Sequence, residues 1–143
     1  MTPTPIQLLE HRKQLTVCGN DLLRLCEIEF ARTTEAQRQI CGAFLFGMVY
    51  AYGKAHRLKP SDLHPLAIST LMDVLQYSPD QATAFSFKLV HATSLGTNNT
   101  IKAIIHRGID GHRQMTAGDQ AGLRQSLLGI FETSGQPYAV QAN

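Results

Sequence analysis

The sequence predicts an all-α fold: a compact bundle of about six helices around an apolar central helix at about residues 35–56. Two observations support this class. The segments show helical spacing and helix-boundary residues, and none keeps the alternation of apolar and polar residues that a strand requires. The stretch from Ile40 to Gly53 contains no charged residue, so a helix there has no polar face and must be surrounded by other helices.

The length and composition are typical of a globular chain. With 143 residues, 43% of them hydrophobic and 17% charged, we expect one domain over residues 1–143, with a loose tail from about 134 to 143.

The first helix is predicted over about Ile6–Phe30, with a break or kink at Cys18–Asp21, where glycine and asparagine interrupt the apolar pattern. The second should open after Thr33–Thr34, which are suitable N-caps, and run to about His56. Within it, small residues recur every four positions and form a ridge that another helix could approach closely: Ala43, Gly47, Ala51 and Ala55. Tyr50 and Tyr52 are both expected in the core, and either would be a candidate interface anchor if it were exposed.

The third helix should begin with Ser61 as its cap and carry Pro65 in its first turn. The fourth should begin at Ser78–Gln81, which combines a cap, a proline, an acid and a capping-box glutamine. After a turn at Gly96–Asn99, the fifth helix is expected over about Thr100–Met115.

The sixth helix is predicted to open at Thr116, with Asp119 three residues later, and to run to about Glu132. Short connections between all these helices imply mostly antiparallel neighbours.

The net charge, the spacing of the cysteines and the residues at the N-terminus each argue against a class of protein. Thirteen basic and eleven acidic side chains give a net charge of +2 and no basic stripe, which argues against nucleic-acid binding. The three cysteines, Cys18, Cys26 and Cys41, lack disulfide or zinc spacing and are expected to be free thiols. With no signal peptide and no segment long enough to span a bilayer, we expect a cytoplasmic protein that does not enter membranes.

The fifth helix has two distinct faces. Apolar residues and His112 share the inward face with Gly108, whereas the outward face carries charged and polar side chains: Lys102, His106, Asp110 and Arg113, with Arg107 beside them. His106 and Asp110 are four residues apart, as a catalytic base and its orienting acid could be. A solvated helix face is the stronger interpretation, because no nucleophile or oxyanion donor lies at a usable spacing.

The remaining features of this segment indicate packing. The histidines of the chain do not converge as metal ligands, so we expect neither metal nor cofactor. Gly108 and Gly111 follow no strand and precede no lysine, so they are not a phosphate loop. Two glycines inside a helix imply that a neighbour presses on Gly108 or that a partner approaches Gly111. His112 is expected to be a core histidine.

The run Ile104–His112, together with Leu63–Ala67 and Tyr77–Ala82, resembles Immunity protein 48, a family of small all-helical bacterial proteins encoded beside toxins of polymorphic toxin systems. The resemblance covers about Leu58–Met115. It implies a non-enzymatic protein that binds and neutralises a cognate toxin domain. The matching face implies a binding surface made of Lys102, His106, Arg107, Asp110 and Arg113, with Gly108, Gly111 and His112 shaping the helix.

Two other classes stay open at this point. A small enzyme would use the His106–Asp110 pair and would need a deep pocket there. A structural or adaptor bundle could form a homodimer through the Ala43–Gly47–Ala51 ridge.

Overall fold

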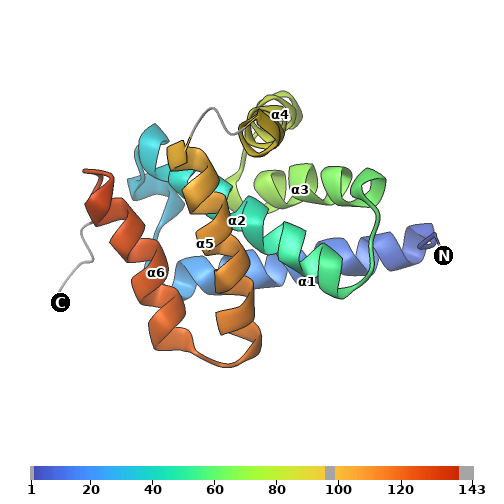
Figure 1. Cartoon of the computed structure of the whole chain (residues 1–143), viewed down its shortest axis with the longest axis horizontal. Helices are drawn as coiled ribbons and strands as arrows, with labels where there is room; N and C mark the ends of the chain where they lie inside the picture. The colour runs from blue at the N-terminus through green and yellow to red at the C-terminus, as the bar shows by residue number, and fades with distance from the viewer. Residues whose placement is uncertain (1, 96–98, 139–143) are drawn as a thin grey trace.

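The computed structural model describes residues 2–95 and 99–138, and every regular element in this part of the chain is a helix (Figure 1). The elements are α1 (Pro5–Leu25), a short 3-10 helix η1 (Phe30–Arg32), α2 (Glu35–Ala55), α3 (Pro60–Leu75), α4 (Pro79–Leu95), α5 (Asn99–Thr116) and α6 (Gln120–Thr133). The all-α prediction is therefore confirmed.

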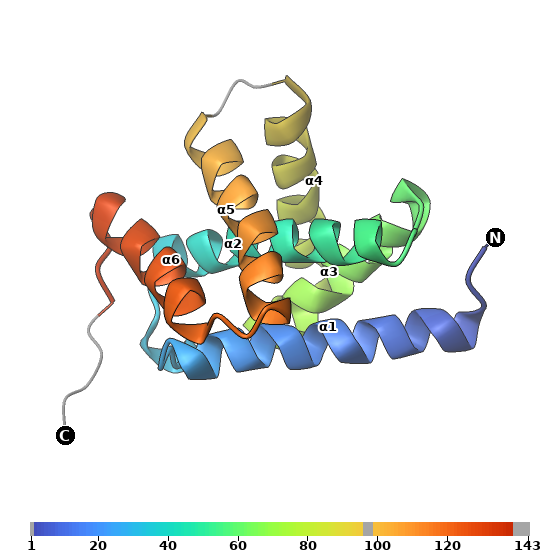
Figure 2. The same cartoon turned by 60° about the horizontal axis from the view of Figure 1, so that its bottom comes forward.

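Helix α2 lies at the centre of the bundle, as predicted from the uncharged stretch Ile40–Gly53 within it. Thr34 begins it with a capping box: the Gln37 amide donates to Thr34 Oγ1 at 3.1 Å, and the Thr34 amide donates to Gln37 Oε1 at 2.9 Å. Helix α1 runs along one side of it, α4 projects from the layer formed by α2 and α3, and α5 crosses α2 (Figure 2). The side chains of Phe44, Leu45 and Met48 are at most 2% exposed.

The most extensive helix contact in the described chain is the crossing of α2 and α5. It is closest at two glycines: a Cβ on Gly47 would lie 2.0 Å from the Ile105 carbonyl oxygen, and a Cβ on Gly108 would lie 2.0 Å from the Phe44 carbonyl oxygen. Helix α5 thus occupies the predicted small-residue ridge. A homodimer through this ridge would require α5 to leave it.

Helix α1 is continuous, so the predicted kink at Cys18–Asp21 is wrong. Gly19 is instead a packing position, where a Cβ would lie 2.6 Å from Val74 Cγ2 of α3. The helix ends at Leu25 and not at Phe30, because Glu27 adopts a left-handed backbone with a φ of 55°.

An ion pair joins α1 to α3. Arg12 donates two hydrogen bonds of 2.8 Å to the Asp73 carboxylate, and Thr16 adds a third of 3.1 Å. The bond from Arg12 holds the pKa of Asp73 below its usual range.

Two predicted helix starts need correction. Helix α3 begins at Pro60 with Lys59 at the cap position, not Ser61, which leaves Pro65 in the second turn. Thr116 ends α5 and does not open α6; Asp119 caps α6 and accepts a hydrogen bond of 3.0 Å from the Gly122 amide.

The start of α4 is as predicted, and the Ser78–Gln81 capping box forms with hydrogen bonds of 3.0 and 3.1 Å. Of the predicted Gly96–Asn99 turn, residues 96–98 lie outside the described chain, and Asn99 is the first residue of α5.

The segment after α6 contacts the beginning of α2. The Gln37 side-chain amide donates to the Pro137 carbonyl at 3.1 Å, and the Glu29 amide donates to the Tyr138 hydroxyl at 2.8 Å. Part of the segment expected to be a loose tail is thus attached to the bundle, and residues 139–143 lie outside the described chain.

Candidate partner-binding surface

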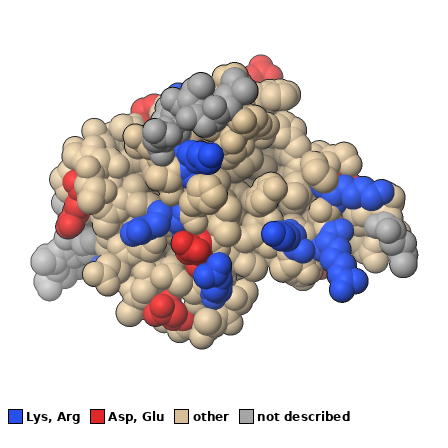
Figure 3. Space-filling model, viewed as in Figure 1, with Lys and Arg blue, Asp and Glu red and all other residues tan. Residues whose placement is uncertain are grey.

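The outward face of α5 carries the predicted binding residues in two settings. His106, Arg107, Asp110 and Arg113 are exposed, and Lys102 is partly buried. Asp110 pairs with Arg113 (Nη2–Oδ1 3.5 Å), while within the described residues no hydrogen bond or ion pair joins Asp110 to His106. On this face, basic and acidic side chains are scattered among a larger uncharged area (Figure 3).

A groove of about 640 Å³ lies between α3, α4 and α5, with α2 as its floor. Its volume is within the range of binding pockets. The lining is mostly apolar, and the α5 side includes the predicted residues Lys102 and His106. The lining residues are Phe46, Val49, Tyr50, Pro60, Leu63, His64, Ala67, Val90, Thr93, Ser94, Lys102, Ile105, His106 and Ile109.

A smaller, more polar hollow of about 340 Å³ lies on the other side of α5, against α6. It is lined by Arg107, Asp110, Gln114, Gly122, Gln125 and Ser126. Helix α5 therefore divides the predicted surface: Lys102 and His106 border the groove, Arg107 and Asp110 border the hollow, and Arg113 lines neither of the two.

Three exposed apolar side chains lie near the groove, and the sequence reasoning missed two of them, Phe87 and Val90. Tyr50 is 52% exposed and Val90 is 36% exposed, and both line the groove; Phe87 on α4 is 60% exposed. The expectation that Tyr50 is a core residue is wrong, whereas Tyr52 is 4% exposed. A signal for the other two was present, because Phe87 and Val90 lie three residues apart on α4 and outside the stripe of its buried Ala82, Ser86 and Leu89.

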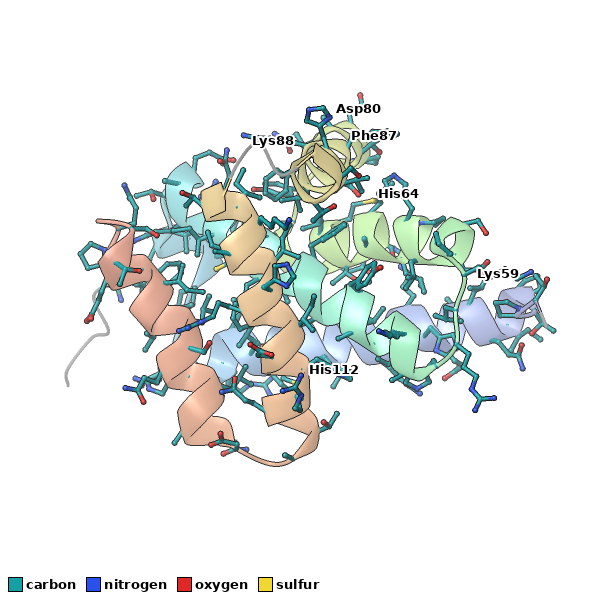
Figure 4. The ribbon with its side chains drawn as sticks, viewed as in Figure 1. Lys59, His64, Asp80, Phe87, Lys88 and His112 are labelled. Atoms are coloured by element: carbon teal, nitrogen blue, oxygen red, sulfur yellow. The ribbon has the colours of Figure 1, made fainter. Side chains whose placement is uncertain are left out.

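His64 stands at the α3 wall of this groove. Its ring contacts the Phe87 ring (centroids 5.0 Å apart), and its Nδ1 lies 3.4 Å from Ser86 Oγ. Figure 4 shows His64 on the side of α3 that faces α4, where Phe87 lies. The Nε2 atom of His64 is buried and has no hydrogen-bond partner among the described residues. A buried polar atom of this kind is costly unless it is paired.

The two glycines of the matching run are packing positions. Besides Gly108 at the crossing, Gly111 is buried, and a Cβ there would lie 2.7 Å from the Cζ atom of Phe44. The neighbour that requires Gly111 is thus a ring of the same chain. His112 is partly buried at the lower end of α5, with its ring edge-on to Tyr52 at 6.1 Å (Figure 4).

His112 belongs to a cluster in which three histidines surround Tyr52. The Tyr52 hydroxyl donates to Gln14 Oε1 at 2.5 Å and lies 2.7 Å from His11 Nδ1, and His56 stacks on the Tyr52 ring at 4.0 Å. Burial, and secondarily the charge of a protonated His56, lowers the pKa of both His11 and His112.

This cluster makes stability depend on pH. Well above pH 6.5, the ordinary pKa of histidine, His11 and His112 are neutral in both states. Below it the unfolded chain binds protons that the folded chain resists, so the free energy of unfolding falls as the pH drops and levels off below the folded pKa values.

Thermal unfolding between pH 8 and pH 5 should show this loss. The loss of stability should be smaller in His112→Gln than in the wild-type protein, and unchanged in His91→Gln, which alters an exposed histidine of α4. Equal slopes in the wild-type protein and both variants would contradict the assignment.

The described residues contain no group of three or more His, Cys, Asp or Glu side chains that could hold a metal ion. Within the same residues, no helix is long and apolar enough to cross a membrane. The cysteines are free, and burial raises the pKa of Cys26 to about 11 and that of Cys41 to about 12. These two thiols are therefore poor nucleophiles at neutral pH.

The fold and this surface define a small helical protein whose exposed features suit contact with another macromolecule. The sequence profile of the family Immunity protein 48 matches residues 11–134, which include every helix that borders the groove and the hollow. The chain belongs to the Immunity protein 48 family. No curated protein and no solved structure matches it.

Proposed function

We propose that this protein binds a cognate toxin domain in the cytoplasm and neutralises it by protein–protein contact, without catalysis. The observation that carries the proposal is membership of an immunity-protein family over residues 11–134. Immunity proteins act on a protein partner, and the partner proposed for this chain is a toxin domain encoded beside it.

The surface around α5 supports this proposal. It combines exposed apolar side chains, which supply affinity when desolvated, with charged side chains of both signs, which steer association and discriminate between partners. Tyr50 and Val90 are exposed beside the groove, and Asp110 and Arg113 are exposed on the outward face.

A growth assay tests neutralisation directly. Cells that express the neighbouring toxin domain should stop growing, and co-expression of this chain should restore growth. The purified proteins should form a complex of one copy each by size exclusion with light scattering. Growth arrest that persists despite normal expression of the folded chain would refute the proposal.

The outward face of α5 is tested by exchanging its charges. Asp110→Lys with Arg113→Glu keeps an ion pair at this spacing, so helix content should be unchanged and the free energy of unfolding should change by only about 0.5 kcal/mol. Because the charges that face the partner are reversed, the Kd for the toxin domain should rise on the order of tenfold.

The exposed pair of Glu10 and Lys13 on α1 offers a matched control, because it has the same three-residue spacing. Glu10→Lys with Lys13→Glu should leave both stability and the Kd unchanged. An unaltered Kd in the α5 exchange, measured beside this control, would remove Asp110 and Arg113 from the binding surface.

A further inference from the structure

We infer that the groove between α3, α4 and α5 receives an apolar segment of the partner that carries a carboxylate beside its apolar side chains. This inference rests on the proposed function and deepens it, because it assigns the part of the surface that supplies affinity and the chemistry of the segment that fills it.

The shape and exposure of the groove support an apolar occupant. Apolar side chains from four helices converge on a volume of about 640 Å³, with Val49 and Phe46 on α2 and Ile105 on α5. Tyr50 and Val90 line the groove and remain 52% and 36% exposed. Covering them would remove apolar surface from water, and buried aromatic anchors of this kind account for much of the affinity of protein interfaces.

The apolar area extends beyond the groove along α4. Phe87, 60% exposed, packs against the ring of His64, which itself lines the α3 wall. Exposed tyrosine, phenylalanine and valine side chains next to one concave surface leave apolar area in contact with water, and such clusters mark interaction sites.

The polar groups of the groove specify the charge of the occupant. Its described lining contains Lys102, His64 and His106, and includes no aspartate or glutamate. Lys102 makes no ion pair within the described residues, and the buried Nε2 of His64 has no hydrogen-bond partner there. A carboxylate entering beside the apolar side chains would pair with Lys102, and the low-dielectric lining would strengthen this contact.

Two substitutions test the two halves of the inference. Val90→Lys places a charge in the apolar groove, and Lys102→Glu reverses the charge of the lysine in its described lining; both positions reach solvent, so the fold should persist. Titration of the toxin domain by calorimetry should show a Kd that rises on the order of tenfold to a hundredfold for each variant.

Matched controls make the same chemical changes elsewhere. Val17→Lys alters a valine on α1 that is 58% exposed, and Lys88→Glu reverses a lysine on α4; neither residue lines the groove. Both controls should change the Kd less than about twofold, as expected for charges outside an interface. Circular dichroism should show the helix content of the wild-type protein in all four variants, which checks that each variant folds.

The carboxylate is tested by reciprocal change. The acidic residues of the toxin domain are replaced by lysine, one at a time. One of these toxin variants should bind Lys102→Glu more tightly than the wild-type toxin domain binds it. Failure of every such variant to restore binding would overturn the assigned carboxylate.

The remaining outcomes separate this inference from the proposed function. If the wild-type chain does not bind the toxin domain, the proposed function fails. If it binds but Val90→Lys and Lys102→Glu bind equally well, only the groove assignment fails. Self-association of the isolated chain that Val90→Lys abolishes would place a second copy in the groove and would overturn the inference.

Discussion

Replacing Gly47 by alanine is expected to lower the free energy of unfolding by about 3 kcal/mol or more, although it adds a single methyl group. The new Cβ would lie 2.0 Å from the Ile105 carbonyl oxygen and 2.9 Å from the Ile109 amide nitrogen. Both obstacles are backbone atoms of α5, which no rotamer change can move. The two helices would have to separate along their most extensive contact. Gly108→Ala should have a similar effect, because its Cβ would meet the Phe44 carbonyl oxygen.

Gly129 on α6 provides the matched control. It lies inside a helix like Gly47, but a Cβ there would have no neighbour within 4 Å. Gly129→Ala should therefore stabilise the protein by about 0.5–1 kcal/mol through helix propensity alone. Urea unfolding followed by circular dichroism measures all three variants. A Gly47→Ala variant as stable as wild type would show that the crossing of α2 and α5 is looser than described.

Truncation of Phe44 should also cost about 3–5 kcal/mol, the range for removing a large aromatic ring from a core. Phe44 is fully buried, and its ring fills the space that Gly111 leaves on α5. Phe44→Ala removes these contacts and leaves a cavity at the centre of the bundle. Against a typical total of about 5–15 kcal/mol, such a loss is a large share of the stability.

The contact between Phe44 and Gly111 can be isolated by a double-mutant cycle. Gly111→Ala alone should destabilise, because its Cβ would lie 2.7 Å from the Phe44 ring. In the Phe44→Ala background this collision is absent, so the same change should be close to neutral or stabilising, with a coupling of about 0.5–3 kcal/mol. Additive effects would mean that the ring and the glycine do not share this space.

The helical architecture and the location of the closest crossing were predictable because both depend on local pattern. An uncharged segment at Ile40–Gly53 requires cover on all sides, and small residues at four-residue spacing around Gly47 indicate where another helix lies close. The error at the start of α3 occurs because neighbouring residues compete for the cap position. Lys59 holds the cap position of α3 without a side-chain bond, whereas Ser61, two residues later, has the hydroxyl that suits an N-cap.

The groove could not be predicted in the same way, because it depends on how α4 is placed against α3 and α5. The outward face of α5 was visible as a helical projection, but a projection does not show that Lys102 and Arg107 border different hollows. Tyr50 was assigned to the core because its whole segment is apolar, and it is exposed only because the surrounding helices leave the groove open. The surfaces between helices depend on tertiary packing, which the spacing of residues along one helix does not show.

The crossing of α2 and α5 also has a consequence for synthesis of the chain. Gly47 and Gly108 are about 60 residues apart, so at about 5–20 residues per second the ribosome adds the second several seconds after the first. During that interval the face of α2 around Phe44 has no α5 to cover it. A nascent chain that is interrupted before α5 therefore exposes this apolar face and tends to aggregate.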